Sequence, residues 1–89
     1  SMLKYDKPRR ARNLARTIAS DILLYNRDEV EEAIRNDNFF EALEEKIDEG
    51  REHYKSRVTP EILQNHNLYD RALVDKLLVA MAYVDSDIW

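Results

Sequence analysis

The sequence predicts one all-α domain, a small bundle of about four helices over residues 8–89, preceded by a basic arm at residues 1–7. One glycine and two prolines in 89 residues are too few for a sheet-rich fold, which needs frequent turn residues. The residues that favour helices, namely Ala, Leu, Glu, Lys and Arg, dominate the chain. Apolar residues also recur at spacings of three and four, as they do on one face of a helix. A chain of this length forms a single domain.

The first helix is expected at residues 8–25, because Pro8 suits the first helical turn, where its missing N–H costs nothing. Its apolar stripe consists of Ala11, Leu14, Ala15, Ile18, Ile22 and Tyr25. Leu23 and Leu24 fall outside that stripe. The C-terminal end of this helix is therefore expected to be apolar on most sides.

A short second helix at residues 27–35 and a third at 39–58 follow, with the break between them at residues 36–38. Asn26 and Asn38 each precede a glutamate by three residues, which is the pattern of a reciprocal helix cap. The apolar arc of the third helix comprises Phe39, Phe40, Leu43, Ile47, Gly50, Tyr54 and Val58. A glycine inside a helix costs about 1 kcal/mol relative to alanine, so Gly50 predicts the close approach of another helix.

The fourth helix is expected over residues 60–84, with a break near 65–67 and an end at 85–87. Thr59 and Pro60 form a typical helix start. Residues 77–84, LLVAMAYV, are the longest apolar run of the chain, and they give this helix two apolar stripes instead of one. A helix that is apolar on every side must be covered on every side.

Three companion helices from the same chain offer too little surface to cover this last helix. We therefore expect a protein–protein interaction module without enzymatic activity, which forms a homo-oligomer and favours a dimer. A protein partner of another kind is the second option. The expected interface consists of Leu23, Leu24, Leu77, Leu78, Met81, Tyr83 and Trp89.

Charge divides the chain into a basic start and an acidic remainder. Residues 1–20 carry six basic groups and one acidic group, whereas residues 21–89 carry eight basic and seventeen acidic groups. The basic arm is formed by Lys7, Arg9, Arg10 and Arg12. It is interpreted as a solvated linker, as a segment that pairs with an acidic protein surface, or as a phosphate-binding segment. The last reading gives the alternative function, a nucleic-acid-binding regulator.

Catalytic and metal-binding patterns are weak. The chain has no cysteine, which excludes disulfides and thiolate metal sites. Glu45, Glu49 and His53 follow one another at one-turn spacing, but the position three before His53 is Gly50, so the Glu-x-x-His motif of di-iron proteins is absent. Asp21 is interpreted as a member of a structural ion pair. We expect no catalytic residue, no metal and no cofactor.

An apolar run of eight residues is too short to span a bilayer, and no secretory segment is recognisable. The sequence therefore predicts a cytoplasmic protein without a membrane partner.

Three segments, residues 11–26, 39–43 and 54–58, are similar to small uncharacterised helical modules of bacterial proteins, some of them at the C-terminal end of regulatory or zinc-ribbon proteins. The resemblance covers residues 9–60. It implies a bacterial accessory module and no particular activity.

Overall fold

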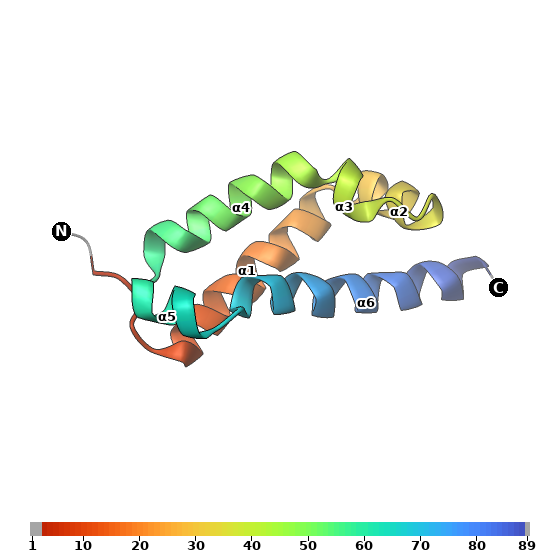
Figure 1. Cartoon of the computed structure of the whole chain (residues 1–89). Helices are drawn as coiled ribbons and strands as arrows, with labels where there is room; N and C mark the ends of the chain where they lie inside the picture. The colour runs from red at the N-terminus through yellow and green to blue at the C-terminus, as the bar shows by residue number, and fades with distance from the viewer. Residues whose placement is uncertain (1–2, 89) are drawn as a thin grey trace.

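The computed structural model describes the backbone of residues 3–88 and the side chains of residues 3–86. Within that part of the chain the fold is all-α, as the sequence predicts (Figure 1). The helices are α1 (Pro8–Tyr25), α2 (Arg27–Arg35), α3 (Phe39–Ala42), α4 (Glu44–Arg57), α5 (Pro60–Asn65) and α6 (Leu68–Ile88).

The segment expected as one helix at 39–58 is two helices, because the backbone turns at Leu43. Leu43 is buried in the core at the corner between α3 and α4. The turn lets α3 pack against α2 while α4 follows α1, a path that a single straight helix could not take (Figure 1). Phe39 stays buried, but Phe40, which was expected on the same apolar arc, is exposed.

The expected break near residues 65–67 is confirmed, since α5 ends at Asn65 and α6 begins at Leu68. The expected helix end at Val84 is wrong, because α6 continues to Ile88. Aspartate and serine have lower helix propensity than alanine by only a fraction of a kcal/mol, roughly 0.5, which does not stop an established helix.

The reciprocal caps expected at Asn26 and Asn38 do not form, although both residues directly precede a helix. The amide Nδ2 of Asn26 instead donates a hydrogen bond to the carbonyl oxygen of Ile22, at 2.7 Å. Asn26 therefore closes the end of α1 as much as it starts α2.

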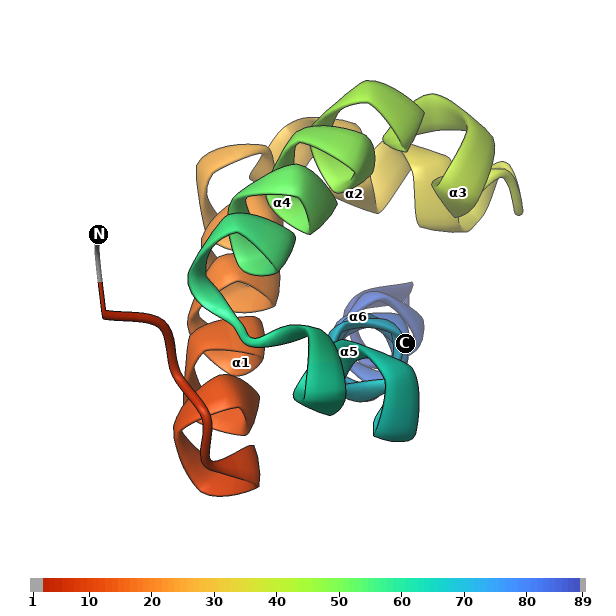
Figure 2. The same cartoon turned by 60° about the vertical axis from the view of Figure 1, so that its left-hand side comes forward.

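The core forms where α1 packs against both α4 and α6, as Figure 2 shows from a second side. It is built mainly of small and aliphatic side chains on α1 and larger ones on the other helices. Its members include Ala11, Ala15, Ile18, Ala19, Ile22, Val30, Leu43, Ile47, Tyr54, Val58, Ile62, Tyr69, Leu73 and Leu77. The alanines of α1 let its backbone approach the neighbouring helices closely.

Gly50 confirms the prediction of a close helix contact. A Cβ at this position would lie 2.9 Å from Cγ2 of Ile18 and 3.0 Å from Cδ1 of Ile22, and it would collide with the hydroxyl of Tyr69. That hydroxyl donates a hydrogen bond to the carbonyl oxygen of Ile47, at 2.7 Å. Burial raises the pKa of Tyr69 to about 12. Gly50 is thus the point where α4, α1 and α6 converge.

The N-terminal segment is attached to the body through Tyr5. The N–H of Tyr5 donates to the carbonyl oxygen of Arg57 (2.8 Å), and the N–H of Thr59 donates to the carbonyl oxygen of Tyr5 (3.0 Å). These bonds form an isolated parallel β-bridge between Tyr5 and Val58. The guanidinium of Arg57 lies 5.4 Å from the centre of the Tyr5 ring. The sequence contained no signal for this attachment.

Candidate interaction surface

α6 exposes more large apolar side chains, all between Val74 and Tyr83, than any other element of the described chain. α1 crosses the N-terminal half of α6 and rises away from the rest (Figure 1). The exposed fractions are 43% for Val74, 57% for Leu78, 70% for Val79, 39% for Met81 and 55% for Tyr83. Part of the apolar surface of α6 is therefore left uncovered by the residues that the structure describes, as the two apolar stripes in the sequence predict.

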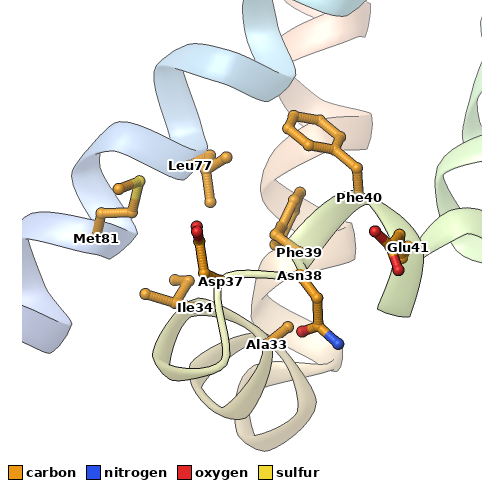
Figure 3. Close-up of a pocket in the computed structure, with 9 residues that line it drawn as sticks. All are labelled: Ala33, Ile34, Asp37, Asn38, Phe39, Phe40, Glu41, Leu77 and Met81. Atoms are coloured by element: carbon orange, nitrogen blue, oxygen red, sulfur yellow. The ribbon is translucent and has the colours of Figure 1, made fainter.

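These five side chains lie on two faces of α6. Val74, Leu78 and Met81 follow one another at spacings of four and three and form the first face. Beside Met81 lies an open hollow of about 180 Å³, which Phe40 of α3 and Leu77 of α6 also line. Figure 3 shows Met81 and Leu77 on α6 opposite Ile34, Asp37 and Phe39. Phe40, at 53% exposed, extends the apolar surface of this face onto α3.

The second face is a groove of about 380 Å³ between α6, α2 and the end of α1. Its apolar residues include Leu24 of α1 together with Val79 and Tyr83 of α6. Leu24 is 64% exposed.

Tyr83 is held at the rim of this groove by Arg27 of α2. Nη2 of Arg27 donates a hydrogen bond to the Tyr83 hydroxyl at 3.2 Å, and the guanidinium lies 5.6 Å from the ring centre. Arg27 Nε also lies 3.6 Å from a carboxylate oxygen of Glu31. Because these groups are exposed, each contact contributes only a fraction of a kcal/mol to stability, on the order of 0.5. Their combined effect is to fix the orientation of the Tyr83 ring.

The residues expected at the interface occupy different environments. Leu24, Leu78, Met81 and Tyr83 are exposed. Leu23 is half-buried and packs against the core. Leu77 is a correction to the expected surface, because it is 9% exposed and belongs to the core of the single chain. Trp89 lies outside the described residues.

Three exposed residues, Phe40, Val74 and Val79, were missing from the expected interface. The spacing of Val74 with Leu78 and Met81 was a usable signal in the sequence. No comparable signal existed for Phe40, because its exposure depends on the turn at Leu43.

The basic side chains at the start of α1 are exposed. Arg9, Arg12 and Arg16 lie on one face of the helix at spacings of three and four. Lys7, Arg9, Arg10 and Arg12 form no ion pair with any carboxylate among residues 3–86. Of the three interpretations of the basic arm, pairing with an acidic surface is therefore not made among the described residues of one subunit.

The side chains considered for chemistry remain apart. Glu45, Glu49 and His53 are exposed on α4, and no three metal-ligating side chains come together within the described part of the chain. Asp21 is also exposed, and it makes none of the ion pairs found between described residues. Tyr54 and Tyr69, whose pKa values burial raises, stack on each other in the core with ring centres 5.7 Å apart. Both serve packing.

No helix formed by the described residues is long and apolar enough to cross a membrane. No family model matches the chain, and neither a curated protein nor a solved structure shows significant similarity to it. The resemblance of residues 9–60 to bacterial helical modules stays a prediction.

Proposed function

We propose that this chain is a helical protein–protein interaction module without enzymatic activity, which self-associates through α6. The observation that carries the proposal is the exposure of five large apolar side chains on one helix, α6, namely Val74, Leu78, Val79, Met81 and Tyr83. Water contact with this surface is unfavourable by about 25 cal/mol per Å² of apolar area. A second copy that covers the surface removes that cost.

The exposed area fits a dimer. Seven large apolar residues on and beside α6 expose on average a little over half of their surface: Leu24, Phe40, Val74, Leu78, Val79, Met81 and Tyr83. Together they present on the order of 700 Å² of apolar residue surface. Specific interfaces bury roughly 800 Å² per partner, and the largest apolar patch of a soluble monomer is roughly 300–600 Å². The two faces together exceed the apolar patch of a typical monomer, which favours a covering partner. The first face with Phe40 supplies about half of this area.

The test compares Leu78→Glu with Leu3→Glu. Leu78 lies on the first face of α6, whereas Leu3 is 89% exposed in the segment that precedes α1. We expect Leu78→Glu to abolish association in light scattering while the far-ultraviolet circular dichroism stays helical, because Leu78 buries less than half of its surface in the single chain. Leu3→Glu should associate like the parent. If both variants and the parent give the same mass, the first face of α6 does not mediate association.

A second function is favoured by the row of Arg9, Arg12 and Arg16 on α1, whose spacing suits contacts to successive phosphates of a nucleic acid. Binding of a fluorescent duplex at low salt should then weaken steeply as salt rises. It should be lost when Arg9, Arg10 and Arg12 are replaced by alanine. No change in duplex anisotropy at low salt would remove this function.

A further inference from the structure

The first apolar face of α6 belongs to a longer stripe of exposed residues. Arg71, Val74, Leu78, Met81 and Asp85 follow one another at spacings of three, four, three and four, and all five are exposed. This is the spacing of residues that meet along the seam between two helices. Asp75 and Ala82, also exposed, flank the stripe on one side. The stripe extends over 15 residues of α6, and its first and last residues are about 21 Å apart along the helix.

The two ends of the stripe carry opposite charges. Arg71 lies seven residues before Leu78 and Asp85 lies seven residues after it. Arg71 makes no side-chain hydrogen bond or ion pair with another described residue, nor does Asp85. Their charges are also at unfavourable ends of their own helix, since Arg71 is near the positive end of the α6 dipole and Asp85 near the negative end.

We propose that two copies of this chain pair through antiparallel α6 helices that cross at Leu78. This inference rests on the proposed self-association and names its orientation and register. In this arrangement Leu78 meets Leu78 of the second copy on the two-fold axis. Val74 lies beside Met81 of the second copy, and Arg71 lies beside Asp85 of the second copy. Two-fold symmetry makes the Val74–Met81 and Arg71–Asp85 contacts twice, whereas the Leu78–Leu78 contact on the axis is made once.

The charges select this orientation over a parallel one. In a parallel pair, Arg71 would face Arg71 of the second copy and Asp85 would face Asp85, so both ends would repel. In the antiparallel pair both ends attract, and each charge comes close to the favourable end of the other helix dipole. The hollow of about 180 Å³ beside Met81 also lies next to the place that Val74 of the second copy would occupy.

Charge reversal tests the pairing of Arg71 with Asp85. Arg71→Glu and Asp85→Arg, measured separately at low salt, should each weaken association by on the order of tenfold, because each change turns two attractions into two repulsions. The double variant restores opposite charges and should associate within about threefold of the parent. Arg10→Glu, on exposed α1, is the matched control and should leave association unchanged. If the double variant associates no better than the single ones, the orientation is wrong.

Cross-linking gives an independent readout, because the chain has no cysteine of its own. An oxidised mixture of Arg71→Cys and Asp85→Cys chains should give a mixed disulfide-linked dimer, whereas either variant alone should give little. Efficient cross-linking of each variant with itself would instead indicate a parallel pair and overturn the inference. In that case self-association would survive, whereas a parent chain that is monomeric at every concentration would remove both.

Discussion

Replacing Gly50 by alanine tests the convergence of α1, α4 and α6 most sharply. In an exposed helix interior this change stabilises a protein by about 1 kcal/mol. Here the new methyl group would meet Ile18 Cγ2 at 2.9 Å and Ile22 Cδ1 at 3.0 Å, and it would displace the hydroxyl of Tyr69. The structure therefore predicts the opposite sign.

The magnitude follows from two costs. Crowding a packed core with an added methyl group costs roughly 1–3 kcal/mol. Moving the Tyr69 hydroxyl breaks its 2.7 Å hydrogen bond to Ile47 and leaves buried polar groups without partners, which costs about 1–3 kcal/mol. After subtraction of the propensity gain of about 1 kcal/mol, we expect Gly50→Ala to lower the free energy of unfolding by about 3 kcal/mol.

The assay is urea unfolding followed by circular dichroism at several fixed protein concentrations, since association would add to the apparent stability. Tyr69→Phe removes the displaced oxygen, so Gly50→Ala should cost at least about 0.5 kcal/mol less in that background. A Gly50→Ala chain as stable as the parent would refute the close contact. Strict additivity of the two changes would show that Tyr69 does not bear the crowding.

Three further outcomes are expected. Because burial raises the pKa of Tyr69 to about 12, the protonated phenol contributes fully to stability below the unfolded value of 10.0, and this contribution falls away between pH 10 and 12. The free energy of unfolding measured by urea titration should drop accordingly, by up to roughly 2–3 kcal/mol, and Tyr69→Phe should reduce this dependence on pH. Leu73 is only 2% exposed, so Leu73→Ala should lower the free energy of unfolding by about 2–5 kcal/mol. Val74 is 43% exposed, so Val74→Ala should lower that of the single chain by less than about 1 kcal/mol. Chemical unfolding under conditions where the chain is dissociated measures both. Tyr5→Ala should lower the free energy of unfolding by about 1 kcal/mol, and with it the thermal midpoint, because the Tyr5 ring packs on Arg57. Leu3→Ala should leave the thermal midpoint unchanged.

The all-α fold and the positions of most helices could be predicted, because the spacing of apolar residues and the residues that start and end helices are local properties of the sequence. Pro8 and Pro60 each begin a helix, as helix-start preferences require. The interruption before Leu68 was visible as a run of polar residues between two apolar segments. Gly50 also indicated a close contact correctly, since only packing compensates for a glycine in that place.

The turn at Leu43 could not be predicted from the sequence, because no glycine or proline marks it. The first part of this apolar segment, α3, packs against α2, and the second part, α4, packs against α1. The chain turns at Leu43 to make both contacts. Phe40 is exposed for the same reason, and the candidate surface extends onto α3.

The candidate surface was predicted as an excess of apolar residues but not in detail. A helix wheel gives two stripes for the last helix, yet which residues stay exposed depends on where α1 leaves α6. Leu77 and Leu78 are neighbours in the sequence, and one is buried while the other is 57% exposed. The direction of each stripe relative to the rest of the fold is a tertiary property, so Leu77 was placed on the wrong side.

The central claim is that the first exposed apolar face of α6, formed by Val74, Leu78 and Met81, is covered by a second copy of the same chain. Sedimentation equilibrium over a wide range of protein concentration tests it most directly, because the measurement reports mass independently of shape. We expect the mass to rise from that of one 10.6 kDa chain to that of two and to stop there. A mass of 10.6 kDa at every concentration would contradict it.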